Sequence, residues 1–108
     1  MAITQGQLSA TATAILTVAA GAKPQVVTND WWYNTDSANA YGIDAFVVKA
    51  GGTAAETNQI ADTVGTELAA NSTVELDIKG LRLDVGDAIY AKGAAADTIT
   101  YTLAHRDD

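Results

Sequence analysis

The sequence predicts an all-β protein. Wherever a hydrophobic pattern is visible, apolar residues mostly recur at every second position, which is the period of a half-buried strand. Gly, Pro, Asn and Asp interrupt these segments at intervals of roughly 8–12 residues, a spacing typical of sandwiches and barrels. The chain has no long amphipathic helical pattern and no internal repeat. We therefore expect residues 1–108 to form one domain, an antiparallel β-sandwich of jelly-roll or Ig-like type with about seven or eight short strands.

The first segment alternates small apolar residues with Ser and Thr. One parity is apolar from Leu8 to Val18. We expect residues 1–12 to form an extended N-terminal arm that runs into a first strand. Gly21, which supplies backbone freedom, and Pro24, which fixes its own φ, then favour a turn.

Two further strands are expected in "QVVTNDWWYN" and "IDAFVVK", with the turn-rich stretch "TDSANAYG" between them. The second strand is apolar on both faces, and a loop, "AGGTAAETN", follows it. Beyond the loop, Ile60, Val64 and Leu68 recur every four residues, as in a short helix. Gly65 and the neighbouring threonines favour a strand there instead.

The C-terminal half returns to strict alternation in "TVELDI", "LRLDV" and "DTITYTLA". The residues expected to face inward are Val74, Leu76 and Ile78, then Leu81, Leu83 and Val85, and finally Ile99, Tyr101 and Leu103. The inward set changes parity across Lys79 and Gly80. A glycine-marked bulge or bend explains this change, because one inserted residue reverses the facing of all that follow.

The stretch "NDWWYN" contains both tryptophans of the chain. Neighbouring side chains on a strand point to opposite faces, so Trp31 and Trp32 cannot both enter one core. Trp32 shares its parity with Val26 and is expected inward. Trp31 and Tyr33 then line a subunit interface, where aromatic residues are enriched, or stack on a sugar ring, or are covered by local loops.

The acidic residues are better explained as hydrogen-bond acceptors within turns than as ligands of a metal site. In "LDVGDAIYAKG", Gly86 and Asp87 indicate a tight turn in which the carboxylate bonds nearby backbone N–H groups. A calcium site from Asp84 and Asp87 is the alternative, but calcium requires six to eight oxygen ligands. The same interpretation, Asx turns rather than a cation site, applies to Asp30, Asp36 and Asp44 with Asn29, Asn34 and Asn39.

Catalytic motifs are missing from the sequence. The single histidine, His105, lies in "AHRDD" and is expected to be a solvated end. Ser9, Ser37 and Ser72 lack G-x-S-x-G surroundings, and the chain has no G-x-x-x-x-G-K loop. We expect a protein that is not an enzyme and holds no cofactor or metal.

Composition and net charge limit the classes of partner that the protein is expected to bind. The net charge of −7, without any cluster of Lys or Arg, argues against nucleic-acid binding. No stretch reaches the 18 or so apolar residues of a membrane span. "AILTVAAGA" has the length of a signal-peptide core, but no basic residue precedes Lys23, so we expect no secretion. Alanine accounts for 22 residues, and Ile, Val, Leu and Phe together for only 23, so the interior is small and oligomerisation would add buried area.

Several features occur together in one order. They are "LSATATAILTV", "AGAKPQVVTN", "WYNTDSA", "ELAANSTVELDIKGLRLDVGDAIYAKG" and a closing "DTITYTLAHRDD". This order resembles small β-sandwich virion proteins of tailed bacteriophages, in which a similar turn, a Gly-Asp before the penultimate strand and a Thr-rich last strand recur. The aromatic pair departs from the resemblance, because aliphatic residues are usual there.

The resemblance implies a structural role in the virion, as a capsid decoration or cement protein or as a component of the neck, tail or baseplate. It implies a homo-oligomer, with a trimer favoured, that binds the major capsid protein or other virion proteins. The arm would add a strand to a neighbouring sheet edge. The residues expected at interfaces are Ile3 and Leu8 toward the capsid and Trp31 and Tyr33 between subunits.

Overall fold

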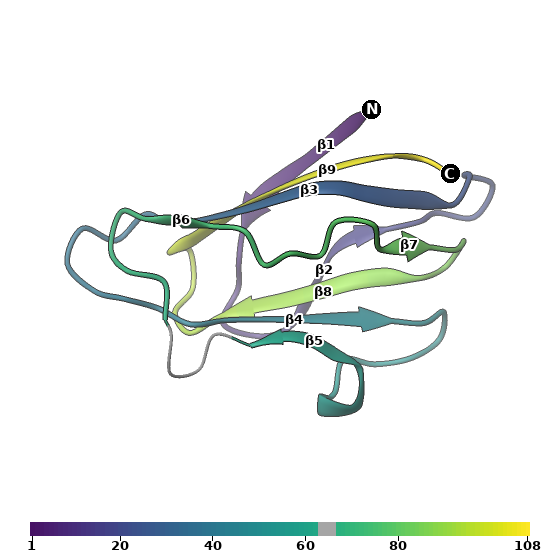
Figure 1. Ribbon diagram of the computed structural model, residues 1–108. Helices are drawn as coiled ribbons and strands as arrows, with labels where there is room; N and C mark the ends of the chain where they lie inside the picture. The colour runs from purple at the N-terminus through teal and green to yellow at the C-terminus, as the bar shows by residue number, and fades with distance from the viewer. Residues whose placement is uncertain (63–66) are drawn as a thin grey trace.

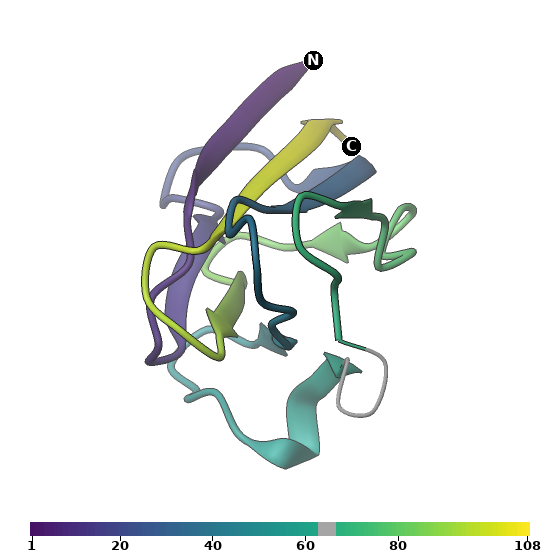
Figure 2. The same ribbon diagram turned by 90° about the vertical axis from the view of Figure 1, so that its left-hand side faces the viewer.

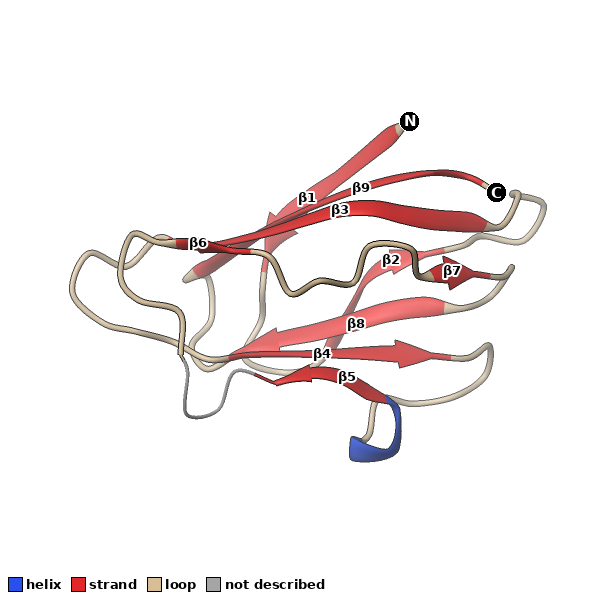
Figure 3. Cartoon of the chain, in the orientation of Figure 1, coloured by secondary structure: helices blue, strands red, loops and turns tan. Residues whose placement is uncertain are grey.

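The computed structural model describes residues 1–62 and 67–108 (Figure 1). It confirms the expected all-β class: two antiparallel sheets face each other, and within the described residues the only helix is one 3-10 turn, η1 Glu56–Asn58 (Figure 3). The strands are β1 Ala2–Gln7, β2 Thr13–Thr17, β3 Gln25–Asn34, β4 Ile43–Val48, β5 Gln59–Asp62, β6 Thr73–Val74, β7 Arg82–Leu83, β8 Ala88–Gly93 and β9 Ile99–Asp107.

Sheet 1 has the order β1-β9-β3-β6, and β7 also pairs with β3. Sheet 2 has the order β2-β8-β4-β5. The chain passes repeatedly between the sheets, so most neighbours in a sheet are distant in sequence, and the first strand pairs with the last. Figure 2 shows the two layers nearly end-on, with β1, β9 and β3 in one and β8, β4 and β5 in the other.

The core lies between the sheets and contains most of the residues that alternation places inward. Side chains without any exposed surface come from both sheets and include Leu8, Val27, Trp32, Leu83, Ile89, Ile99 and Leu103. Val74, Leu76 and Leu81 are partly buried and pack against this cluster. β4 is apolar on both faces as expected, since Ile43, Phe46 and Val48 are all buried.

The alternation of the first segment is broken by a backbone irregularity, and one expected facing, that of Val85, is wrong. Ile15 and Leu16 are both buried although they are neighbours, because the pairing of β2 with β8 shifts register between Ala14 and Leu16. Val85, expected inward, is 44% exposed because it lies in the turn after β7 rather than in a strand.

The parity change at Lys79-Gly80 is a bend. Gly80 has φ 89°, its N–H donates to the carbonyl of Val27, and the N–H of Val27 donates to the carbonyl of Leu81. The segment "TVELDI" is a strand only over Thr73–Val74, and β7 begins after the bend. Between them, Ile78 is buried against the core as expected.

The expected strand after the loop is partly present. β5 covers Gln59–Asp62, and Leu68 forms an isolated bridge with Tyr41, with N–H···O distances of 2.9 and 3.1 Å. Val64 and Gly65 lie outside the described residues. The described part favours a strand over the helix that the four-residue spacing allowed.

Candidate interaction surface

The two tryptophans of β3 face opposite sides of sheet 1. Trp32 is fully buried; its indole N–H donates to the Asp30 carboxylate at 2.7 Å, and its ring centroid lies 6.3 Å from that of Tyr101. Trp31 and Tyr33 remain 39% and 36% exposed. The inward facing expected for Trp32 is therefore confirmed.

The reason for that facing differs from the sequence argument. Val27 is also buried, although it has the opposite parity, whereas Val26 is only half-buried. The pairing of β3 with β9 shifts register between Val27 and Asn29, and this bulge allows both Val27 and Trp32 to point inward.

Asp30 holds the inward side of this strand in place. Its side chain is buried and accepts, besides the Trp32 bond, hydrogen bonds from the backbone N–H groups of Leu76 at 2.6 Å and Ile78 at 3.4 Å. The carboxylate thus joins β3 to the segment after β6. The expected Asx turn is absent at Asp30, because the backbone N–H groups that bind its carboxylate lie 46 and 48 residues away rather than two or three.

The outward side of β3 belongs to a surface that we call the uncharged face. β1, β9 and β3 contribute three residues each to it, and they lie in three rows by strand register: Ile3–Ala104–Asn29, Gln5–Thr102–Trp31 and Gln7–Thr100–Tyr33. By strand alternation and register all nine lie on the side opposite to inward residues such as Leu103, Tyr101 and Trp32, although Ala104 in the first row is only 3% exposed.

The chemistry of this face is amphipathic and neutral. Ile3 is 63% exposed, and the aromatic rings lie beside amide and hydroxyl groups. The Gln5 amide donates to the Thr102 hydroxyl at 3.1 Å, and the Tyr33 hydroxyl donates to Asn71 at 3.2 Å. Charged groups lie at its borders, among them Arg106 and the terminal ammonium of Met1 beyond the first row and Glu75 beyond β3. A chain with net charge −7 thus keeps this face free of charge.

The segment expected to be a free arm is mostly a strand of the sheet. β1 pairs with β9 over all six of its residues, from Ala2 opposite His105 to Gln7 opposite Thr100. Leu8 follows β1 and is completely buried in the core. Of the two residues expected to contact a capsid, Leu8 is therefore inaccessible in this fold, and Ile3 is exposed.

His105 is not the solvated end that we expected. It lies in β9 between β1 and β3, and the residue is only 8% exposed. Its Nε2 lies 3.0 Å from the Thr4 hydroxyl and its Nδ1 lies 2.8 Å from the Gln25 amide oxygen. Burial lowers the pKa of His105 below its usual value of 6.5. The Thr4–His105 contact thus joins β1 to β9, and the neutral Gln25 amide on the other side of the ring joins β9 to β3.

The loop after β3 uses the Asx chemistry that we expected. The Asp36 carboxylate accepts hydrogen bonds from the backbone N–H groups of Ala38 at 2.7 Å and Asn39 at 2.8 Å, and these bonds lower its pKa. Asn34 is buried and donates to the carbonyl oxygens of Asn39 and Leu68. Its own oxygen accepts from the Asp36 N–H at 2.9 Å.

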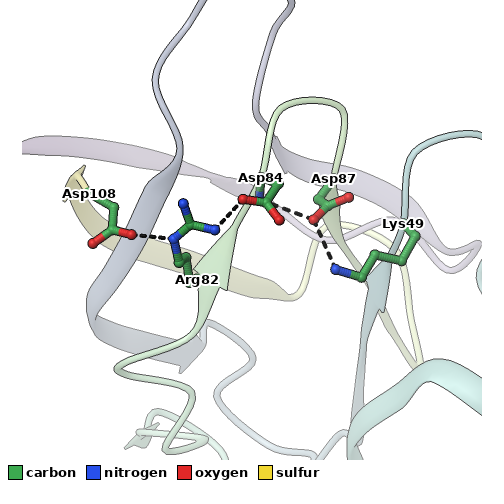
Figure 4. A network of polar contacts seen from close by, with 5 residues as sticks. All are labelled: Lys49, Arg82, Asp84, Asp87 and Asp108. Carbon is green, nitrogen blue, oxygen red and sulfur yellow. Dashed lines mark hydrogen bonds and ion pairs between the residues drawn. The ribbon is translucent and has the colours of Figure 1, made fainter.

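The turn at Asp84–Asp87 is also built as expected (Figure 4). Gly86 has φ 90°, which glycine adopts without a steric penalty, and the Asp87 carboxylate accepts from the N–H groups of Asp84 at 3.1 Å and Ala50 at 3.2 Å. Burial alone would raise the pKa of Asp87, but these bonds and Lys49 at 3.3 Å hold it below its usual value. Asp84 is engaged by Arg82, which also pairs with Asp108.

Asp44 lies on sheet 2, away from the other two aspartates that flank the aromatic stretch. Its carboxylate lies 3.8 Å from the Lys92 ammonium and accepts from the Gln59 amide at 3.2 Å. With Lys92 and Glu67 it lines a groove of about 430 Å³. Among residues 1–62 and 67–108, no three His, Cys, Asp or Glu side chains gather in a way that could hold a metal ion.

Comparisons of the chain with known protein families, with curated proteins and with solved structures find no match in any of the three. In the described part of the chain, no helix is both long and apolar enough to cross a membrane. The uncharged face, defined by strand register, is the feature from which we infer a function.

Proposed function

We propose that this protein is a non-enzymatic structural component of a phage virion, which decorates or cements the capsid through the uncharged face. The observation that carries the proposal is the exposure of Ile3, Trp31 and Tyr33 on one three-stranded surface whose nine residues include no charged side chain. The order of motifs that resembles phage β-sandwich proteins supports the virion setting.

An uncharged surface can be buried against a partner at a low cost in desolvation. Charged groups are depleted at the centres of protein interfaces because burying them is costly, and aromatic residues are enriched there. Trp31 and Tyr33 offer apolar area with few rotatable bonds, while neighbouring Gln and Thr side chains can pair with polar groups of a partner. Repeated by symmetry over a particle, many such modest contacts give retention that one contact could not.

The test within this proposal is quantitative mass spectrometry of purified virions. On the order of hundreds of copies per particle supports capsid decoration, because capsid symmetry multiplies equivalent sites. A dozen copies or fewer support the alternative within the same class, a place in the neck, tail or baseplate. Absence from the particles would contradict both.

A binding assay then tests the face itself. Particles that lack the protein are mixed with purified wild type, Trp31→Ala or Thr17→Ala and then sedimented. Thr17 is exposed on sheet 2, so its truncation is the matched control. If Trp31 is a central contact, its loss weakens binding by roughly thirtyfold, while the control binds as wild type does. Equal binding of all three proteins rules out the uncharged face as the contact.

A carbohydrate-binding module is the second candidate. Trp31 lies in the same row as Thr102 and Gln5, so an aromatic plane adjoins hydroxyl and amide groups, the set that a neutral sugar ring requires. Titration with a panel of neutral glycans, followed by tryptophan fluorescence, distinguishes this function. A saturable, sugar-specific change that Trp31→Ala abolishes supports it, since buried Trp32 remains as the internal reference. No change with any glycan counts against it.

A further inference from the structure

The free edge of β1 is a second surface, distinct from the face. β1 is the outermost strand of sheet 1, so one side of its backbone pairs with β9, and no strand of residues 1–62 or 67–108 pairs with the other side. In Figures 1 and 2 its N-terminal half projects beyond the neighbouring strands. Its sequence, "AITQGQ", contains neither a charge nor a proline. Natural edge strands usually carry such features because they prevent pairing with other chains.

The other edge strands described here are too short or too irregular to pair readily with another chain. β6 and β7 have two residues each. β2 has a register shift between Ala14 and Leu16, and β5 has four residues and pairs with β4 through a further shift. By contrast, β1 pairs over six consecutive residues without any shift, which gives it the longest regular edge in the described part of the chain.

β1 is also held in place by contacts with the rest of the domain, so its free edge already has the conformation of a strand. Gly6 lies directly against Tyr101: a Cβ at this position would come within 2.7 Å of the Tyr101 hydroxyl oxygen. Thr4 is joined to buried His105, and Leu8 anchors the end of the strand in the core. A strand held in this way loses little further conformational entropy when another strand pairs with it.

We propose that the free edge of β1 pairs antiparallel with β1 of a second copy of this chain, about a two-fold axis. In an antiparallel pair, side chains that lie directly opposite each other project from the same face of the sheet. Ile3, Gln5 and Gln7 of one copy must therefore lie opposite odd-numbered residues in β1 of the other copy. Registers centred on Thr4, with Ile3 opposite Gln5, or on Gln5 itself, meet this condition. In either register no charged side chain of β1 meets another, although each copy has a net charge of −7.

This arrangement extends the proposed assembly role by naming one partner. The order β3-β9-β1-β1-β9-β3 makes one continuous six-stranded surface and places both uncharged faces on the same side. A second copy fits this edge because its own β1 offers the same uncharged and unshifted strand, and because the pairing continues the uncharged face across both chains. The inference is tested on the purified chain alone, so its failure leaves capsid binding through the face untouched.

The first experiment measures molecular mass by light scattering and sedimentation at about 100 μM chain, because association depends on concentration. The expected mass is that of two chains of 11.1 kDa. Ile3→Lys/Gln5→Lys places like charges opposite each other at the junction and should weaken association at least about tenfold. The control, Thr13→Lys/Thr17→Lys, adds the same charges to the edge strand of sheet 2 and should remain dimeric. A monomer or a trimer in the wild type, or a dimer lost only in the control, overturns the proposal.

A second experiment does not depend on how the lysine variants fold. The chain contains no cysteine, so single cysteines report proximity cleanly. A disulfide needs Cα atoms within about 7 Å, so under oxidation only the residue at the two-fold axis should crosslink two chains. This is Thr4→Cys if the pairing is centred on Thr4, and Gln5→Cys if it is centred on Gln5. Gln7→Cys, two or three positions from the centre, should not. A dimer in which neither Thr4→Cys nor Gln5→Cys crosslinks rules out β1 pairing and leaves another surface.

Discussion

Replacing Asp30 by Asn should destabilise the protein strongly, although the two side chains have nearly the same shape. The Asp30 carboxylate is buried and accepts three hydrogen bonds, from the Trp32 indole and from the N–H groups of Leu76 and Ile78. One of its oxygens accepts the two short bonds. An amide can keep its oxygen there, but its NH₂ group then faces the N–H of Ile78 as donor against donor.

The magnitude follows from these bonds. Hydrogen bonds to a charged acceptor contribute about 1.5–3 kcal/mol each and neutral ones about 1 kcal/mol, so weakening two and losing a third costs roughly 3 kcal/mol. The lower cost of burying a neutral amide offsets part of this, and we expect a net loss of about 2 kcal/mol. For a domain of this size that lowers the melting temperature by roughly 10 °C.

The assay is urea unfolding at neutral pH, followed by tryptophan fluorescence, with Asp97→Asn as control. Asp97 is exposed and has φ 60°, a conformation that Asn tolerates well, so the control should stay within about 0.5 kcal/mol of the wild type. If Asp30→Asn unfolds at the same urea concentration as the control, the desolvation cost of the carboxylate equals its hydrogen-bond gain, and the anchoring argument fails.

Three further predictions test other contacts. Burial lowers the pKa of His105, so the unfolded chain binds the proton more readily; stability should fall as the pH drops below about 6.5, and His105→Gln should remove that part of the slope in urea midpoints. Asp87→Asn should cost about 1–2 kcal/mol because two backbone N–H groups depend on this carboxylate, whereas Lys49→Met, at an exposed ammonium, should cost less than about 1 kcal/mol in the same assay. Gly6→Ala should cost about 1–3 kcal/mol through the clash with Tyr101, and Tyr101→Phe in the same chain should recover part of that loss in a double-mutant cycle.

The fold class was predictable because alternation is a local signal. Ile99, Tyr101 and Leu103 face inward as the period of two requires, and the turn at Gly86 follows from residues that are adjacent in sequence. Simple alternation did not predict the facing correctly where a bulge or a turn interrupted the strand, and Val85 in the turn after β7 is exposed. Ile15 is buried out of register with its neighbours, and Trp32 is buried together with Val27 of the opposite parity. A bulge depends on pairing with a distant strand, which alternation within one segment does not report.

The uncharged face was predicted only in part, since its rows are assembled by strand register. Trp31 and Tyr33 were identified as exposed candidates from the aromatic stretch alone. That Thr102 and Gln5 share a row with Trp31 requires the first and last strands to be neighbours, and no local pattern indicates this. Because of the same long-range pairing, the expected arm is strand β1, and His105 lies within the sheet instead of at a solvated end.

Asp30 connects the stability of the fold to the orientation of the uncharged face. The facing of Trp31 is set by the burial of Trp32, because adjacent side chains on one strand cannot exchange sides independently. Trp32 is held by Asp30, which itself depends on backbone N–H groups 46 and 48 residues away. A variant that weakens Asp30 should therefore disturb the indole ring of Trp31 on the outer surface, although Asp30 itself has almost no exposed surface. Loss of near-UV circular dichroism together with weaker binding through the face, in a protein that is still folded, is the joint outcome that this coupling requires.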